Sequence, residues 1–330
     1  MRKRNCRIFI LMLLVLLSNS GCRENKIEDT KFLLGTIVDI KIYQTDKKTA
    51  KEAIKKAFYE IERINHVFSH YREDSFISKI NKNSGNWVDV SEEVINLIGQ
   101  AIKFSVLTDG AFDITIGPVV NLWGFGAAKK HYIPSDKEIS DNLFLVDYKN
   151  VEIDREKNKI RIKNGTRIDM GGIAKGYAVD CVVKIFKEIG IKNALINAGG
   201  NIFVMGKRKR AKPFKIGIQH PREEKEIIAA LKIFDAATAT SGDYEKYFVE
   251  NGKRYHHIFN PKTGRPANLC QSVTIIAKDA VISDILSTGI FVMGPETGIK
   301  LVESLPEVEC FIVDESGSII KSKGFDKYVK

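Results

Sequence analysis

Cysteine is scarce in this sequence, and the cysteines present lie too far apart for a paired role. The chain of 330 residues contains five of them. They are Cys6, Cys22, Cys181, Cys270 and Cys310. The lack of a Cys-x-x-Cys pair excludes the common zinc-binding spacing, and the wide separation implies no disulfide framework. We expect Cys181 and Cys310, which lie in apolar runs, to be small core residues.

Long apolar runs are also missing once the N-terminal segment has passed. No later stretch reaches the roughly 20 apolar residues that a membrane-spanning helix needs. The sequence likewise contains no internal repeat, no low-complexity block and no linker. These absences predict one compact unit.

The N-terminus has the pattern of an export signal. Four basic residues lie between positions 2 and 7, and the apolar run Ile8–Leu17 follows them. This run is too short for a permanent membrane helix and indicates a cleaved signal. We expect residues 1–21 to be a lipoprotein signal and residues 22–330 to be the mature chain, lipidated on Cys22. Asn19 departs from the apolar residue usual at its position, and an ordinary cleaved signal is the alternative.

The charge of the chain is strongly positive. Its formal value is +11, and removal of the four basic signal residues leaves +7. The excess includes the cluster KRKRAK, Lys207–Lys212. A solvated loop is the simpler interpretation of this cluster, and attraction to an anionic bilayer or a phosphorylated ligand is the other. No nucleic-acid-binding motif accompanies the charge, so we expect no nucleic-acid partner.

We expect an exported, membrane-anchored lipoprotein on the periplasmic face of the inner membrane.

Apolar periodicity predicts strands and helices in an irregular order. We expect strands or hairpins at residues 32–43, 151–164, 194–206, 214–221, 237–261 and 309–325. We expect helices at residues 49–69, 91–110 and 176–190, and a strand followed by a helix over 272–294. We expect residues 110–126 to be irregular. Because the order lacks regular βαβ spacing, the predicted fold class is α+β and not a doubly wound sheet.

The segment DMGGIAKG, Asp169–Gly176, places glycines before a predicted helix. Its spacing matches neither the dinucleotide fingerprint nor the P-loop. The glycines permit close approach of a ligand to the backbone, and the amides that begin the helix favour an anion, with Lys175 as an added positive charge. Asp169 would then bind hydroxyl or amide groups of the same ligand. A tight structural turn is the alternative.

Asp284 and Thr288 lie four residues apart in SDILSTG and face the same side of a predicted helix. A carboxylate and a hydroxyl are hard oxygen ligands that suit Mg²⁺, which usually keeps water and phosphate oxygens as its other ligands. The alternative is that Ser283 or Asp284 caps the helix.

Two adjacent histidines, His256 and His257, precede an Asn-Pro turn and a Thr-Gly-Arg-Pro turn. Either could act as a general base. Because adjacent residues of a strand face opposite ways, at most one of them enters a given site. A buried, hydrogen-bonded structural histidine is the alternative.

The segment GAFDITIGPVVNLWGFG, residues 110–126, is rich in glycine and aromatic residues. Phe112, Trp123 and Phe125 could form an apolar wall for a flat ring. Ordinary core packing is the alternative.

Taken together, these segments resemble one family, the FAD:protein FMN transferases, which are the ApbE flavin-transferring lipoproteins. The resemblance rests on YREDSFISKIN, GAFDITIGPVVNLWGFG, DMGGIAKGYAVD, INAGGNI, TSGDYEKYF, YHHIFNPKTGRP and SDILSTGIFVMG, in the family's order. It covers nearly the whole mature chain. It implies an α+β fold in a single two-lobed domain, with FAD bound between the lobes.

The resemblance also assigns roles to residues. The residues that it places against FAD, the substrate, are Leu34, Tyr71, Ala111, Phe112, Asp113, Asp169, Lys175 and Ile258. Leu34 replaces a Met of many members and keeps its volume. Mg²⁺ would be held by Asp284, Thr288 and the backbone carbonyl of Gly172, where a backbone ligand tolerates the Ala or Ser of other members. His257 matches the histidine proposed to act in the transfer.

The implied reaction is Mg²⁺-dependent transfer of FMN from FAD to a Thr or Ser hydroxyl of an exported or membrane redox protein, with release of AMP. The metal would neutralise the diphosphate, the hydroxyl would attack the FMN phosphorus in line, and His257 would accept the proton. Expected acceptors are flavin-bearing subunits of membrane redox complexes and other exported flavoproteins. The alternatives are an FAD pyrophosphatase, which would use water and give FMN and AMP, and a non-catalytic lipoprotein that stores or delivers flavin.

Overall fold

The computed structural model describes residues 26–126 and 130–329. The predicted signal, residues 1–21, and the predicted lipidation site Cys22 lie outside the described residues. Over those two ranges, no helix is long and apolar enough to cross a membrane.

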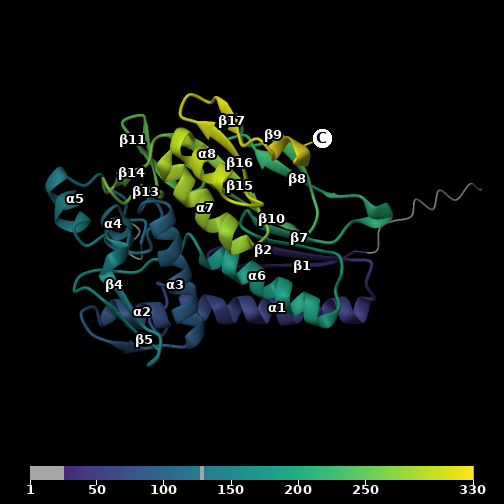
Figure 1. Ribbon diagram of the computed structural model, residues 1–330, viewed down its shortest axis with the longest axis horizontal. Coiled ribbons are helices and arrows are strands. Elements are labelled where there is room, and N and C mark those ends of the chain that lie inside the picture. The colour runs from purple at the N-terminus through teal and green to yellow at the C-terminus, as the bar shows by residue number, and fades with distance from the viewer. Residues whose placement is uncertain (1–25, 127–129, 330) are drawn as a thin grey trace, which may run out of the picture.

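An eight-stranded sheet forms the centre of the molecule (Figure 1). Its strand order is β1-β2-β6-β7-β10-β15-β16-β17, and every neighbouring pair is antiparallel. The strands are β1 (Lys26–Leu33), β2 (Thr36–Tyr43), β6 (Ala194–Ala198), β7 (Asn201–Met205), β10 (Ala236–Gly242), β15 (Cys270–Ala277), β16 (Glu309–Asp314) and β17 (Ile319–Lys321). An antiparallel sheet covered by helices confirms the predicted α+β class.

The two faces of this sheet are covered differently. Helices α1 (Lys47–Phe68), α6 (Ala174–Ile189) and α7 (Ala280–Met293) pack along one face, in contact with one another (Figure 1). Helix α8 (Pro295–Ser304) follows α7. The hairpin of β8 (Phe214–Gln219) and β9 (Ile227–Ile233) and the short turn η3 (Phe325–Tyr328) cover the other face through a separate apolar cluster.

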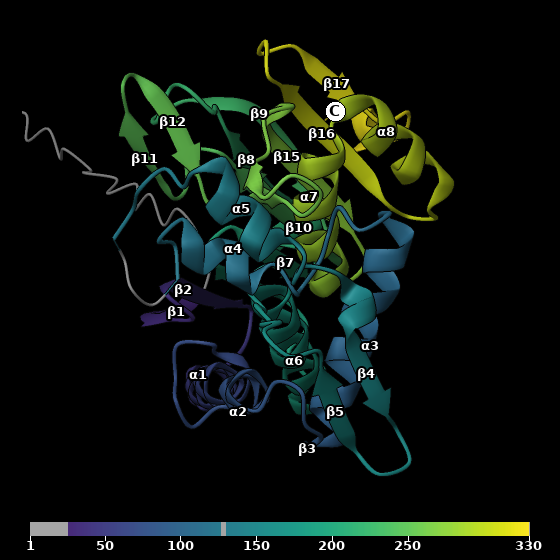
Figure 2. The same ribbon diagram turned by 90° about the vertical axis from the view of Figure 1, so that its left-hand side faces the viewer.

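The remaining elements pack beside the first turn of α6, at the end of the molecule that faces the viewer in Figure 2. The helices are α2 (Phe76–Lys82), α3 (Glu92–Leu107), α4 (Gly117–Leu122) and α5 (Asp136–Leu143). The strands are β3 (Val88–Asp89), β4 (Val151–Asp154) and β5 (Lys159–Ile162) in one small sheet, and the hairpins β11 (Tyr247–Glu250) with β12 (Lys253–His256) and β13 (Phe259–Asn260) with β14 (Arg265–Pro266). Two one-turn 3-10 helices complete the order, η1 (Tyr148–Asn150) and η2 (Lys209–Ala211).

One hydrophobic cluster joins these parts. It contains apolar side chains of β2, α1, α3, α6 and α7, with Ile40, Ile98 and Phe186 among those fully buried. A shared core of this kind makes the described chain one domain. The division into two lobes with FAD between them stays a prediction.

Two predictions about local structure were wrong. The segment 32–43 is a hairpin and not one strand, because Leu34 and Gly35 both have positive φ and turn the chain between β1 and β2. The segment 110–126 is not wholly irregular, because it contains helix α4, in which Pro118 stands in the first turn where proline is tolerated.

Candidate functional site

The glycine turn at residues 170–173 leads directly into α6. The carboxylate of Asp169 accepts a hydrogen bond of 2.7 Å from the amide of Gly171. Helix α6 has no side-chain cap at its N-cap residue, Ile173. The amides of Ala174 and Gly176, in the first turn of α6, are bonded to the carbonyl oxygen of Met170 and to the carboxylate of Asp284 at 2.9 Å each. The positive end of the helix dipole still faces the turn, and the binding of an anion there stays a prediction.

Gly176 has a different purpose from the turn glycines. A Cβ at this position would lie 2.4 Å from the carbonyl oxygen of Ala280 and 2.7 Å from the Cα of Val281. The residue is glycine because α6 and α7 touch backbone to backbone here. It fixes the contact between the two helices that carry the predicted site.

Asp284 and Thr288 both face the glycine turn from α7. Asp284 is buried, and its Oδ2 accepts a hydrogen bond of 2.9 Å from the amide of Gly176. A Cβ added at Gly172 would lie 3.4 Å from the Oγ1 of Thr288 and 3.0 Å from Cε2 of Phe112. The structure thus brings together Asp284, Thr288 and Gly172, the three residues predicted to hold a metal.

The alternative that Ser283 or Asp284 caps α7 is wrong. The carboxylate of Asp180, on α6, accepts the amide hydrogens of Ala280 and Val281 at 2.8 Å each and so caps the helix from outside. Asp284, one turn further along, therefore caps no amide of α7 and instead accepts the Gly176 amide in the first turn of α6.

Lys175 supplies a positive charge between the turn and α7. Its ammonium lies 3.0 Å from the carbonyl oxygen of Gly171 and 3.5 Å from Oδ1 of Asp284. The Lys175 ammonium therefore lies between a carbonyl oxygen and a carboxylate oxygen. A metal ion at this place would have the same two kinds of oxygen around it.

Two hydroxyls that sequence reasoning missed complete this group. Ser241, on β10, forms hydrogen bonds through its Oγ with Ser287 at 2.9 Å and with Thr288 at 3.2 Å. Its position in the sequence, 46 residues before Ser287, gave no signal. Ser287 adjoins Thr288 in the motif and could have been included from its oxygen chemistry.

Asp169 is part of a second small group with Tyr71 and His70. The Nδ1 of His70 lies 3.5 Å from Oδ1 of Asp169, and the rings of His70 and Tyr71 are 3.9 Å apart. The Nε2 of His70 is buried without a hydrogen-bond partner. Burial, and next the charge of Asp169, raise the pKa of Tyr71. A cavity of about 30 Å³ adjoins this group, lined by His70, Asn81, Gly117, Asn121, Arg167, Ile168 and Asp169.

The loop of Ala111, Phe112 and Asp113 lies against the glycine turn through Phe112, as the contact with Gly172 shows. Asp113 is buried, and its carboxylate accepts hydrogen bonds from the amide and hydroxyl of Thr115 and from the amide of Tyr148. Burial raises the pKa of Asp113 to about 6. Its side chain therefore shapes the loop that presents Phe112.

His256 and His257 lie in different surroundings: His256 is the last residue of β12, and His257 follows it in a bend. The ring of His256 is buried and bonds the carbonyl of Ala267 at 2.7 Å and the amide of Ile258 at 3.2 Å, so it is structural. The Nδ1 of His257 lies 3.2 Å from the carbonyl oxygen of Lys246, to which it donates. Burial, with the nearby charges of Lys246 and His256, lowers the pKa of His257 to about 3.

The three aromatic residues proposed as one wall do not form one. Trp123 is fully buried in a cluster with Val119, Ile139 and Phe259, where core packing is its role. Phe125 lies near His257, with ring centroids 6.4 Å apart. Of the three, Phe112 lies against the glycine turn, beside Gly172.

Leu34 and Ile258, the other two residues predicted to contact flavin, lie in different parts of the fold. Leu34 is at the tip of the β1–β2 hairpin with φ of 54° and packs on the main cluster. Ile258 is buried in the same apolar cluster as Ala111. The roles of these residues stay predictions from the resemblance.

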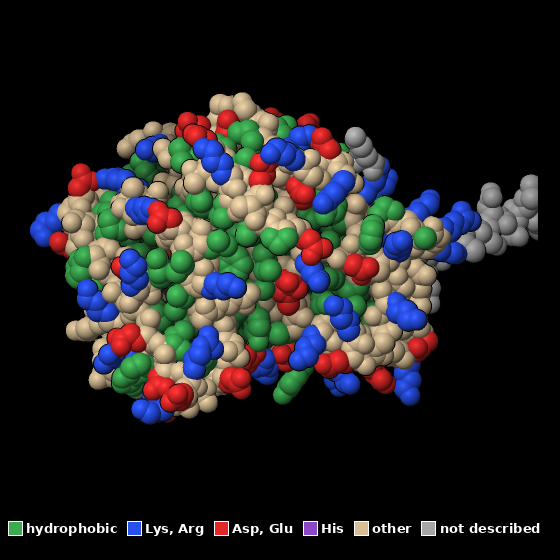
Figure 3. Space-filling view, viewed as in Figure 1, with side chains coloured by type: hydrophobic (Ala, Val, Ile, Leu, Met, Phe, Trp, Pro, Cys, Tyr) green, Lys and Arg blue, Asp and Glu red, His purple; other side chains and the backbone are tan. Residues whose placement is uncertain are grey.

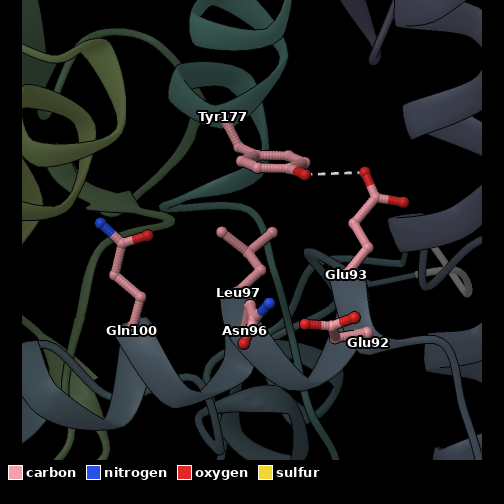
Figure 4. A pocket seen from close by; sticks show the side chains of 6 residues that line it. All are labelled: Glu92, Glu93, Asn96, Leu97, Gln100 and Tyr177. Atoms are coloured by element: carbon pink, nitrogen blue, oxygen red, sulfur yellow. Dashed lines mark hydrogen bonds between the residues drawn. The ribbon is translucent and has the colours of Figure 1, made fainter.

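A larger cavity of about 360 Å³ opens elsewhere, between the first turns of α3 and the side of α6 (Figure 4). In it the hydroxyl of Tyr177 donates to Glu93 at 2.7 Å, and Arg63 pairs with the same carboxylate. None of the predicted site residues lines this cavity, which is walled by Glu92, Glu93, Asn96, Leu97, Gln100 and Tyr177.

The fold and the site together define an α+β protein with an oxygen-rich, cation-holding group at the start of a helix. The chain belongs to the ApbE family, whose model matches residues 34–312.

Individual relatives agree over nearly the whole chain. It is 34% identical over 308 residues to an FAD:protein FMN transferase of Vibrio cholerae, covering 90% of this chain and 91% of that one. A protein with the same description from Haemophilus influenzae is 32% identical and covers 88% of this chain and 87% of its own. The crystal structure of the ApbE protein of Thermotoga maritima has a TM-score of 0.88 at 40% identity, covering 93% of this chain and all of that one.

Proposed function

We propose that this chain transfers FMN from FAD to a hydroxyl group of an acceptor protein and releases AMP. The observation that carries the proposal is the convergence of Asp284, Thr288 and Gly172 beside the ammonium of Lys175. Relatives at 30–34% identity that are described as FAD:protein FMN transferases support it.

The donor set suits Mg²⁺. It consists of the carboxylate of Asp284 and the hydroxyl of Thr288, with two further hydroxyls adjacent. No group of three or more His, Cys, Asp or Glu in the described ranges could hold a metal, so carbonyl, phosphate or water oxygens must complete the set. When bound, Mg²⁺ supplies charge neutralisation for the diphosphate and makes AMP a better leaving group.

The protein's own groups bind and orient the nucleotide. The positive N-terminal end of the α6 dipole and the ammonium of Lys175 favour the diphosphate. Asp169 and Tyr71 lie together at the edge of the same turn, where they can contact polar groups and the ring of a flavin nucleotide. A carboxylate at an anion-binding turn is then explained, because Asp169 binds donors of the ligand and not its phosphates.

His257 is the proposed base. Because its Nδ1 donates to the carbonyl of Lys246, its Nε2 carries the lone pair. The acceptor hydroxyl attacks the FMN phosphorus, the new Oγ–P bond forms as the P–O bond to AMP breaks, and the hydroxyl proton passes to Nε2. The lowered pKa keeps the ring neutral before the reaction.

The acceptors that we propose are Thr or Ser residues of flavin-bearing subunits of membrane redox complexes or of other exported proteins. The expected lipid on Cys22 would hold the enzyme at the membrane near them. This part of the proposal rests on the N-terminal sequence pattern.

The test uses the chain with FAD, Mg²⁺ and an acceptor peptide containing a single Thr, with the matching Val peptide as control. We expect mass spectrometry to find FMN on the Thr peptide alone, and chromatography to find an equal amount of AMP. Free FMN and AMP with no modified peptide would support the pyrophosphatase instead. Bound FAD without either product would support the non-catalytic flavin carrier.

A further inference from the structure

One end of the molecule carries an excess of positive charge. We call it the basic end and define it by ten exposed residues: Lys26, Lys47, Lys48, Lys51, Lys192, Lys207, Arg208, Lys209, Arg210 and Lys212. Lys26 begins β1, and Lys47, Lys48 and Lys51 lie in the first turns of α1. Lys192 lies between α6 and β6, and the other five lie in the loop between β7 and β8. Figure 3 shows Lys and Arg side chains at this end, on the right.

Contacts around Tyr43 bring these segments together. Lys26 lies opposite Tyr43 in the β1–β2 pairing, and the guanidinium of Arg208 is 5.8 Å from the Tyr43 ring. The side chain of Gln44 donates to the carbonyl of Lys207 at 3.2 Å. The amide of Lys207 in turn donates to Asn193 at 2.9 Å. Four segments that are distant in sequence therefore form one surface.

Positive charges outnumber negative ones on this surface. Glu28, Asp46 and Glu52 belong to the same segments, and Asp235 accepts the amide of Gly206 beside them. Ten basic residues less four acidic ones leave +6, against a formal charge of +7 for the whole chain after the predicted signal. Most of the net charge of the mature chain is therefore concentrated at this end. An asymmetry of this kind directs a protein toward an anionic surface.

An exposed aromatic residue accompanies the charge. Phe234 is 53% exposed, and the ammonium of Lys207 lies 4.9 Å from its ring. A ring that is open to solvent among lysines is the combination that binds at the headgroup level of a bilayer.

The described chain begins at this same end. Lys26 is only four residues after Cys22, and four extended residues span at most about 14 Å. A lipid on Cys22 would thus hold the basic end close to the membrane. We propose that the basic end docks on an anionic lipid surface and orients the enzyme there.

The orientation has a consequence for the reaction. The glycine turn precedes the first residue of α6, and the basic end lies just beyond the last. A helix of 16 residues is about 24 Å long. Docking therefore directs the proposed site away from the bilayer, toward acceptors that project from it. The basic end does not depend on the proposed function, whereas the lipid on Cys22 belongs to that proposal.

The test uses the chain without residues 1–22, so that no lipid contributes. This form keeps every described residue, and with them every described member of the four hydrophobic clusters, so we expect it to fold. Sedimentation is measured with vesicles of phosphatidylcholine alone and with vesicles in which about one lipid in three is phosphatidylglycerol. We expect binding to the anionic vesicles only, and release as salt is raised from about 0.1 M to 0.5 M.

Two variants with the same change of charge decide whether the surface is specific. The first is Lys47→Glu, Lys48→Glu, Lys207→Glu and Lys212→Glu, and the control reverses the exposed Lys137, Lys157, Lys163 and Lys300 on other elements. We expect the first to lose at least about 100-fold in partition coefficient and the control to lose much less. Equal losses, or binding to neutral vesicles, would overturn the proposal. Transfer of FMN in solution, measured without vesicles, checks that both variants are folded and separates a failure of docking from a failure of the proposed function.

Discussion

Asp284 on α7 accepts a hydrogen bond of 2.9 Å from the backbone amide of Gly176 on α6. The other carboxylate oxygen faces Lys175 at 3.5 Å. One buried side chain therefore joins the two helices and presents an oxygen to the glycine turn. The contact depends on Gly176, since a side chain there would meet the backbone of α7.

Gly176→Ala is expected to destabilise the protein. The added Cβ would approach the Ala280 carbonyl to 2.4 Å, and backbone cannot yield as a side chain can. We expect a loss of about 2–3 kcal/mol in the free energy of unfolding by urea. Gly99→Ala, in α3, is the control, because its Cβ would crowd the exposed end of Arg155, which can move, would lie at an ordinary 3.9 Å from Cδ1 of Ile153, and helix propensity favours Ala. A loss of similar size in both variants would contradict the account of Gly176.

Asp180 is expected to make stability depend on pH. Burial raises its pKa to about 6, above the ordinary value of about 3.9 in the unfolded chain. The folded state therefore holds the proton more tightly, so the stability that protonated Asp180 contributes is complete below about pH 4 and is lost as the pH rises through 6. Asp180→Asn keeps one oxygen that can accept a hydrogen bond from an amide of α7. We expect it to reduce this fall in the free energy of unfolding by about 2 kcal/mol. Asp113, shifted in the same direction, should leave a residual slope. Urea unfolding from pH 4 to 7 measures both, and an unchanged slope in Asp180→Asn would contradict the assignment.

We expect kcat/KM for transfer not to fall as the pH is lowered to about 5, as it would if His257 became protonated in this range. Its pKa of about 3 keeps the ring neutral in the free enzyme over this range. His257→Gln should lower kcat by about 100-fold or more and leave FAD affinity within a few-fold. Stopped assays of kcat/KM between pH 5 and 8 check the profile. A limb near pH 6 in the native chain that disappears in the variant would show that the ring titrates near pH 6, which would contradict the lowered pKa.

Lys175→Met is expected to separate binding of the metal from binding of the nucleotide. Loss of the ammonium removes a cation that competes for Asp284, so Mg²⁺ alone should bind a few-fold more tightly. The same change removes a positive charge from the diphosphate site, so FAD should bind about 10-fold more weakly. The metal-dependent rise in melting temperature without FAD reports the first effect, and flavin fluorescence reports the second. Lys175→Arg is the control and should keep the nucleotide affinity near the native value. Equal weakening of both ligands in the Met variant would oppose this assignment of Lys175.

Local sequence patterns predicted those parts of the site that lie within one element. Asp284 and Thr288 follow from helical spacing, whereas His257 lies just after the end of β12, so strand alternation does not fix its direction. Ser241 and His70 could not be predicted this way, because their partners Thr288 and Asp169 lie on distant segments. Tertiary contact, and not local pattern, decides such pairs.

The errors in the fold have the same origin. Residues 32–43 have the composition of one strand, but a turn at Leu34 and Gly35 folds the segment into two. The sequence allowed Trp123 to face a ligand ring. In the structure its Nε1 donates a hydrogen bond of 2.9 Å to the carbonyl of Gly264, and its ring packs in a buried apolar cluster. The α+β class was correct because it needs only the order of the elements and not their exact ends.

The most direct test of the central claim compares the native chain with Asp284→Asn in a Mg²⁺ titration of FMN transfer to a Thr-containing acceptor, followed by mass spectrometry. Asn keeps an oxygen for the Gly176 amide but loses the charge that a divalent ion requires. We predict that the native chain modifies the acceptor only when Mg²⁺ is present and that the variant is slower by more than about 100-fold at the same metal concentration. Transfer that continues in EDTA, or a variant as fast as the native chain, would contradict the claim that a metal held by Asp284 activates the diphosphate.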